Sequence, residues 1–338
     1  MNEQEIVDRL ISTAGESGIQ SDPNAIVNFY VALKSKPMAI LTGPMSRGKV
    51  ALVESLMRVL TGGDPIQCQK MDGHAWWAGE SGNVGFCTDA QTRFNTTKIL
   101  CLVEEALQPE NARRVFMACL TRISPAELNG FFSEVAFQIQ HERLMRLPYA
   151  HLTEPLPYPP NLFLIGTMDT AAFDWSNVDL LSGATIIDWR ATPVNESQPC
   201  PEATSVLGDS EDVFLESCIR NKKAACLKLH RVLGRHSQFL QPLFHIKDAL
   251  AEYGVRISRL AMEQVIIYLA NAWTREGYGL FDSEAKCNLA ISLDWAMAQI
   301  VLRHAEVQLR DSAALRQRLQ ISLDGQFAHS KTFLEGLI

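Results

Sequence analysis

An apolar segment, a glycine-rich loop and a helix-forming run, in that order, constrain this chain more than any other feature of its sequence. Residues 38–42 (MAILT) are apolar, residues 43–49 read GPMSRGK, and no proline interrupts the helix-forming run at 50–60. A strand, a G-x-x-x-x-G-K loop and a helix form the P-loop, in which backbone N–H groups and the lysine bind nucleotide phosphates. The alternative is a glycine turn that only joins a buried strand to an amphipathic helix.

The predicted phosphate site departs from a working P-loop at one position. Lys49 is expected to reach the β- and γ-phosphate oxygens, and the next residue is normally a Ser or Thr whose hydroxyl binds Mg²⁺. Here that residue is Val50, which has no side-chain oxygen. The sequence therefore predicts a phosphate site with impaired metal chemistry. Its candidate binding residues are Gly43, Pro44, Met45, Ser46, Arg47, Gly48, Lys49 and Val50.

Composition predicts a globular cytoplasmic protein. Of the 338 residues, 47% are hydrophobic and 20% are charged, which is enough apolar material for a large core. The eight cysteines form no C-x-x-C pair, as expected of reduced thiols, and no apolar run is long enough to span a membrane. The net charge of −7 argues against broad electrostatic attraction to nucleic acid by this chain alone.

The chain divides into three expected parts. Residues 1–36 read as a helical segment of two helices, because Asp22 followed by Pro23 is a typical helix start. Apolar strand-like runs then alternate with helices, so we expect an α/β core at 37–200 that ends in a Pro- and Ser-rich linker. We expect a helical lid domain at 201–338. The expected strands are 38–42, 99–103, 161–167 and 185–189, and the expected later helices are 213–235, 246–253, 261–276, 283–309 and 312–319.

A pair of acids follows the second expected strand. Residues 99–103 (ILCLV) lead directly into Glu104 and Glu105. P-loop NTPases use an acid at a strand end to hold Mg²⁺, and many place a second acid beside it to polarise the attacking water. The alternative is that the two carboxylates only solvate the end of a strand.

A third motif carries a family resemblance. Residues 158–173 (YPPNLFLIGTMDTAAF) resemble the McrB-type branch of the AAA+ NTPases, the motor subunits of methylation-dependent restriction systems. That branch typically reads P-x-N-L-x-x-I-G-T-M-N-x-x-D-R at this point. The family's GPPGTGKT loop falls on residues 43–50, its Asp-Glu pair on Glu104 and Glu105, and its FGYR lid segment on residues 253–256. The resemblance implies a three-layer α/β/α P-loop core with a parallel sheet, followed by an all-α lid.

The resemblance also implies roles for individual residues. Glu104 would hold Mg²⁺, Glu105 would act beside it, and Arg256 would sense the γ-phosphate from the lid. Asp169 falls where the family has an Asn that orients water near the γ-phosphate. The implied cofactor is ATP or GTP with Mg²⁺, and the alternative is that nucleotide binding is vestigial.

Several departures fall on catalytic positions of the family pattern. Val50 replaces the metal-binding Ser or Thr, Asp169 replaces the Asn, and Ala172 and Phe173 replace an Asp-Arg pair. The double arginine that acts across a subunit boundary falls near residues 182–185 (SGAT), which contain no cation. Where an arginine finger has been measured, it accelerates hydrolysis by about 10³–10⁵-fold. Hydrolysis is therefore expected to be weak or lost.

We therefore expect a degenerate McrB-like AAA+ nucleotide-binding subunit. It would assemble with partner AAA+ subunits and a nuclease or McrC-like effector in a DNA-targeting anti-phage defence system, contacting DNA through the assembly and no membrane. The alternative is an active ATP- or GTP-hydrolysing motor whose catalytic residues are completed by a partner subunit.

A substitution at Val50 tests the expected loss of hydrolysis. The purified chain should turn over ATP and GTP at background, and Val50→Thr should not rescue it, because the water-orienting Asn and the arginine finger remain absent. Steady-state phosphate release checks both proteins. Turnover near the rate of about 1 s⁻¹ that many enzymes reach by the wild-type chain would contradict the expectation.

Overall fold

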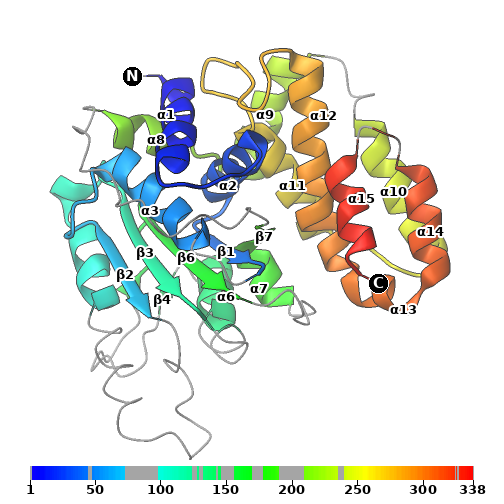
Figure 1. Ribbon diagram of the computed structural model, residues 1–338, viewed down its shortest axis with the longest axis horizontal. Coiled ribbons are helices and arrows are strands. Elements are labelled where there is room, and N and C mark those ends of the chain that lie inside the picture. The colour runs from blue at the N-terminus through cyan, green and yellow to red at the C-terminus, as the bar shows by residue number, and fades with distance from the viewer. Residues whose placement is uncertain are drawn as a thin grey trace, which may run out of the picture.

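A computed structural model shows an α/β protein built on a five-stranded parallel sheet, with a group of helices to one side (Figure 1). None of the helices that it describes has the length and apolar character to cross a membrane. It describes residues 2–44, 48–72, 98–123, 128, 132–141, 144–145, 156–169, 178–189, 209–234, 240–323, 325 and 327–337.

The sheet brings the ends of three strands to one edge. Each strand is parallel to its neighbours, and Thr42 of the P-loop strand is level with Met168 on one side and Asp188 on the other. The residues that follow these three strands therefore meet at the carboxyl edge of the sheet. The strand order across the sheet is β2 (Cys68–Asp72), β3 (Phe116–Thr121), β6 (Leu162–Met168), β1 (Met38–Thr42) and β7 (Ala184–Asp188).

Three of the four expected strands are confirmed, and the fourth is wrong. β1 has the predicted bounds, and β6 and β7 lie within one residue of theirs. The expected strand 99–103 instead lies in a helix over residues 98–106. Its buried side chains, Ile99, Leu102, Val103 and Ala106, recur at helical spacing, and a short apolar run alone does not distinguish this pattern from a strand.

Two strands of the sheet, β2 and β3, were not predicted. β3 (FMACLT) is as apolar as β1, and its first five residues are fully buried between β2 and β6. β2 (CQKMD) lies at the edge of the sheet, and its polar residues do not give the apolar run expected of a buried strand. The second strand of the core therefore lies before the expected strand 99–103 in the sequence, and the third strand lies after it.

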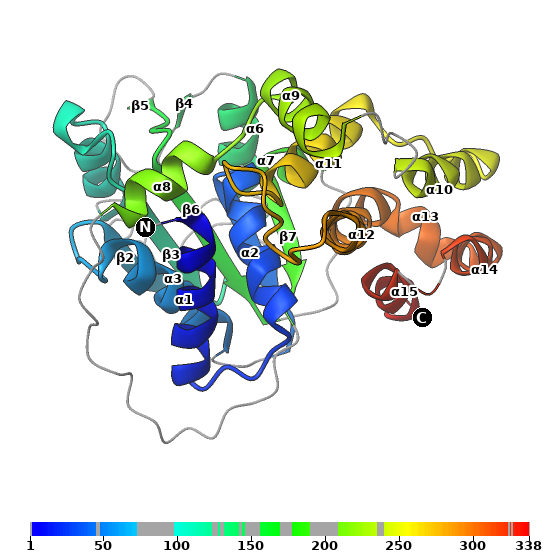
Figure 2. The same cartoon turned by 90° about the horizontal axis from the view of Figure 1, so that it is seen from above.

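Helices cover both faces of the sheet, which gives three layers (Figure 2). One face packs against α1 (Glu3–Glu16), α2 (Pro23–Ser35), α3 (Gly48–Thr61) and α8 (Ser210–Ser217). The other face packs against helix 98–106, α6 (Ser133–His141) and α7 (Val178–Gly183). Alternate residues of β1 serve the two layers, because Ala39 and Leu41 join the first core and Met38 and Ile40 join the second.

The amino-terminal helices belong to the core. α1 has a capping box in which Asn2 and Glu5 exchange hydrogen bonds, and α2 begins, as predicted, with Asp22 as its cap and a proline in its first turn. Their apolar side chains share one buried cluster with α3 and the sheet. The segment 1–36 is thus an integral layer and not an appendage.

The expected long helices of the second half are interrupted. The helix expected at 213–235 is split into α8, whose Phe214 packs on Phe163 of the sheet, and α9. The helix expected at 283–309 contains a π-helix, Met297–Leu302. The C-terminal helical region comprises α9 (Lys222–Leu233), α10 (Gln241–Glu252), α11 (Arg259–Asn271), α12 (Ala285–Ala296), the π-helix, α13 (Glu306–Asp311), α14 (Ala313–Ser322) and α15 (Ala328–Glu335).

A buried polar cluster fastens α2 to α1 and to the C-terminal helical region. Lys34 of α2 is fully buried, forms an ion pair with Glu3, and donates a hydrogen bond to the carbonyl oxygen of Asn271 at 2.9 Å. Asn28 donates to Gln299 of the π-helix at 3.2 Å and accepts from the Tyr268 hydroxyl at 2.6 Å. These contacts hold α11 and the π-helix against the core.

Glu3→Gln tests the energetic weight of this cluster. The substitution leaves the Lys34 ammonium buried without its counterion, and breaking a buried pair costs about 3–5 kcal/mol of unfolding free energy. Glu216→Gln, which removes a partner from the exposed Arg275–Glu216 pair, is the matched control and should cost less than about 1 kcal/mol. Urea unfolding measures both, and equal effects of the two substitutions would contradict the assignment.

Candidate functional site

The P-loop strand ends in a glycine that no other residue can replace without strain. Gly43 follows β1 with φ of +144°, and a Cβ atom there would lie 2.3 Å from the carbonyl oxygen of Trp189. Trp189 follows β7, and its N–H donates to the carbonyl oxygen of Thr42 at 2.7 Å. The close approach of these two strand ends sets the start of the loop.

The P-loop lysine is buried and bonded within the protein. α3 begins at Gly48, and the side chain of Lys49 is only 1% exposed. Its Nζ lies 2.8 Å from the Asp169 carboxylate and donates to the carbonyl oxygens of Pro44 at 2.6 Å and Gly43 at 3.3 Å. The ammonium group thus has three oxygen partners within this chain, one of them a carboxylate.

Strand order explains why Asp169 reaches Lys49. β6 lies directly beside β1 in the sheet, and Asp169 is the first residue after β6. Because parallel strands end at the same edge, the residue after β6 lies next to the loop after β1. Lys49 and Asp169, which are about 120 residues apart in the chain, therefore lie side by side at this edge.

A second ion pair lies at this edge. Asp188, the last residue of β7, is 2.8 Å from the guanidinium group of Arg303, which follows the π-helix. Arg303 is 4% exposed, also pairs with Glu306 at 2.8 Å, and lies over the ring of Phe333. The C-terminal helical region is therefore attached to the carboxyl edge through an arginine that the sequence analysis did not select.

The described residues at this edge do not fit the Mg²⁺ site of a P-loop NTPase. Such a site needs a hydroxyl after the lysine and a carboxylate at a neighbouring strand end. Val50 supplies no oxygen, β3 ends in Thr121, and Asp169 and Asp188 are both ion-paired with cations of the protein. Within the described parts of the chain, no three His, Cys, Asp or Glu side chains gather as metal ligands.

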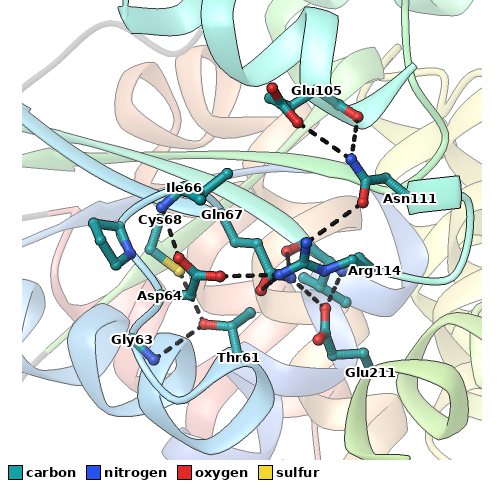
Figure 3. Close-up of polar contacts among 12 residues, drawn as sticks. Thr61, Gly63, Asp64, Ile66, Gln67, Cys68, Glu105, Asn111, Arg114 and Glu211 are labelled. Carbon is teal, nitrogen blue, oxygen red and sulfur yellow. Dashed lines mark hydrogen bonds and ion pairs between the residues drawn. The ribbon is translucent and has the colours of Figure 1, made fainter. Parts of the chain in front are cut away.

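Glu104 and Glu105 lie away from this site. Both are exposed at the end of helix 98–106, and the side chain of Asn111 donates to the backbone oxygen of Glu105 at 2.9 Å (Figure 3). Asn161, which precedes β6, donates in turn to the backbone oxygen of Asn111 at 3.0 Å. This is the amino edge of the sheet, and a strand of six or seven residues separates it from the carboxyl edge by about 20 Å. The structure does not bring the two acids to Lys49.

A polar network around Arg114 connects the elements at the amino edge of the sheet (Figure 3). Arg114 lies in the turn before β3, not on a helix, and its guanidinium donates to Asp64 at 2.9 Å and to Gln67 at 2.6 Å. Gln67 also donates to Glu211 of α8 at 2.6 Å. Burial raises the pKa of Glu211, while its hydrogen bonds from Val115 N–H and Gln67 act in the opposite direction. These contacts join β2, β3 and α8, so we assign Arg114 a structural role.

The other residues selected from the sequence do not gather around Lys49 in the described parts of the chain. Arg256 is exposed in the turn between α10 and α11, and the structure does not join it to Lys49. Ser182 and Thr185 are 5% and 3% exposed, and Gln264 donates to the carbonyl oxygen of Ser182 at 2.9 Å, so this segment is covered by α11 and not presented to a neighbour. Met45, Ser46, Arg47, Ala172, Phe173 and the expected linker lie outside the described residues.

Comparison with known proteins adds no relative. No family model matches the sequence, and a search of curated proteins finds no match. The arrangement of the site is therefore the basis for the functional argument.

Asp169→Asn tests whether the carboxylate blocks the lysine. Removing the charge should free Lys49 and raise the affinity for pyrophosphate or ATP by about 10–100-fold, the value of one charge-assisted hydrogen bond. Isothermal titration calorimetry of wild type and variant measures the change. The double variant Lys49→Ala/Asp169→Asn is the control and should not show the increase in affinity. Unchanged affinity in Asp169→Asn would show that the ion pair does not limit phosphate binding.

Proposed function

We propose that this chain is a degenerate McrB-like AAA+ subunit in which the nucleotide site has become a structural element. The observation that carries the proposal is the ion pair between the buried Lys49 and the half-buried Asp169 at the end of β1. A P-loop lysine whose counterion belongs to its own chain needs no nucleotide to satisfy its charge.

The ion pair opposes phosphate binding in two ways. An incoming phosphate has to displace the Asp169 carboxylate and the two loop carbonyl oxygens from Lys49. It also approaches the negative charge of Asp169 at short distance, where repulsion in a partly buried site is several times stronger than in water. Nucleotide affinity is therefore low while Asp169 is ionised.

Apart from Lys49, other groups that nucleotide hydrolysis requires are also missing from the described residues near this lysine. Val50 and Thr121 provide no metal ligand of the required kind, and Glu104 and Glu105 lie at the other edge of the sheet. Positioning and electrostatic stabilisation supply almost all of the catalysis in phosphoryl transfer. A subunit without these groups has a structural role in an assembly and does not hydrolyse nucleotide.

The assembly role follows from the family resemblance. McrB-like subunits work with other AAA+ chains and with a nuclease, so partner AAA+ subunits and a McrC-like effector are the proposed partners, in defence against phage DNA. The net charge of −7 favours contact with DNA through those partners and not through this chain alone. The α/β core is retained, and Lys49 is already paired with Asp169. Such a subunit can act as a scaffold whose fold does not depend on nucleotide.

Light scattering of the purified chain, alone and with the proteins encoded beside it, tests the proposal. The chain alone should not form a turnover-competent ring, and with its partner it should form a stable mixed assembly, whose interface needs at least about 1,000 Å² of buried area. Lys49→Ala/Asp169→Ala, which removes both charges, should assemble as wild type does. A homo-hexamer of the isolated chain with nucleotide-stimulated hydrolysis would favour the active-motor alternative and contradict the proposal.

A further inference from the structure

A cavity lies at the amino edge of the sheet, away from Lys49. Its volume is about 600 Å³, within the range of small-molecule sites. Pro37 and Pro160, which precede β1 and β6, form part of its wall, as does Gly183, which precedes β7. Helix α11 forms the opposite wall, so the cavity separates the core from the C-terminal helical region.

Lys36 places a cation in the wall of this cavity. The residue ends α2, is 9% exposed, and donates from Nζ to the carbonyl oxygens of Leu181 at 2.8 Å and Ala184 at 3.1 Å. A lysine ammonium has three donors, so one is left. No carboxylate among the described residues lies within ion-pair distance of Lys36.

Arg220 adds a second cation without a carboxylate partner among the described residues. Its Nη1 donates to the carbonyl oxygen of Pro160 at 2.7 Å, and its guanidinium lies 5.0 Å from the ring centre of Phe163. Nε and Nη2 are buried and have no oxygen or nitrogen acceptor among the described residues, and the Cys218 thiol is the polar group next to the guanidinium. These two atoms form one edge of the planar fork that binds carboxylate or phosphate in a bidentate way. Burial raises the pKa of the adjacent Cys218 thiol, so that thiol stays neutral and does not balance the charge.

The rest of the wall suits an organic molecule. Glu263, the acid in the wall, is engaged by Lys222 and Arg259, each at 2.9 Å. Gln264 is 6% exposed, and its Oε1 is buried without a donor among the described residues. The apolar part of the wall is formed by Ile139, Tyr158, Leu260, Ile267 and Ile300.

We propose that this cavity binds a small organic anion, whose carboxylate or phosphate group contacts Lys36 and Arg220 and whose apolar body lies against α11. Lys36 is buried and Arg220 is half-buried, so keeping both charges without a counterion is costly, and a bound anion reduces that cost. Binding requires the guanidinium of Arg220 to turn its free edge toward the cavity. Because Lys36 belongs to the core and Arg220 lies at the start of the C-terminal helical region, the ligand would bridge the two. The inference does not depend on the P-loop proposal.

The competing explanation assigns both cations to the fold alone. Lys36 would then only bind the carbonyl oxygens of Leu181 in α7 and Ala184 at the start of β7, and Arg220 would only stack on Phe163. A purely structural pair would bind an anion no better than a neutral molecule of the same shape. The two explanations therefore differ in ligand charge, which can be varied without changing the protein.

The charge state of Lys36 gives a second readout. Burial lowers the pKa of Lys36 to about 7, and a bound anion favours its protonated form. The other ionisable groups around it are Arg220, Lys222 and Glu263, with His304 after the π-helix, whose pKa burial also lowers. A ligand carboxylate stays ionised throughout, so affinity should increase as the pH falls from about 8 to about 6.5.

Calorimetric titration of the full-length wild-type chain tests the proposal with three probes of similar body: phenylacetate, phenyl phosphate and neutral 2-phenylethanol. At least one anion should bind at a single site with Kd below about 10 mM and at least about tenfold more tightly than the alcohol. Comparison of the two anions distinguishes a carboxylate site from a phosphate site. Absence of binding by both anions, or equal binding of the alcohol, would overturn the proposal.

Matched variants locate the site. Lys36→Met and Arg220→Met should each weaken the preferred anion by about tenfold or more, the effect of one charge-assisted contact. Lys223→Met and Arg231→Met remove the same charges from exposed positions of α9 and should leave the affinity unchanged. Equal loss in all four variants would overturn the assignment to this cavity. If Lys36→Met or Arg220→Met does not fold, the wild-type comparison of charged and neutral probes still decides the question.

Discussion

The ion pair between Lys49 and Asp169 is the interaction on which the interpretation of this protein depends. It exists because β6 lies beside β1 and both strands end at the same edge of the sheet. A carboxylate after β6 therefore meets the P-loop lysine without any special loop. In a P-loop enzyme the space next to the lysine has to stay free for phosphate. A carboxylate in that space binds the lysine in place of the phosphate.

The two edges of the sheet have different properties. At the carboxyl edge, Lys49 pairs with Asp169 and Arg303 pairs with Asp188, so these two carboxylates are each matched by a cation of the chain. At the amino edge, the cavity beside α11 has Lys36 and Arg220 without such partners among the described residues. Among the described residues, the cations Lys49 and Arg303 at the carboxyl edge thus have carboxylate partners, whereas Lys36 and Arg220 at the amino edge do not.

Much of this arrangement could be predicted from sequence. The strand and loop at 38–49 and the strand before Asp169 have strong local signals, and their meeting follows from parallel pairing. The acid pair at Glu104 and Glu105 was misplaced, because a five-residue apolar run has the same composition in a buried helix turn as in a strand. The Arg303–Asp188 pair and the cavity could not be predicted, since they join segments more than 100 residues apart that have no common motif.

Side-chain NMR of the Lys49 ammonium group is the most direct measurement of the central claim. A hydrogen-bonded, buried ammonium exchanges slowly with water and gives its own signal, which the Lys49→Ala variant identifies by its loss. The account predicts that this signal is present without nucleotide and does not shift when ATP is added. A signal that moves with ATP, in parallel with saturable binding, would show that phosphate displaces Asp169 and would contradict the account.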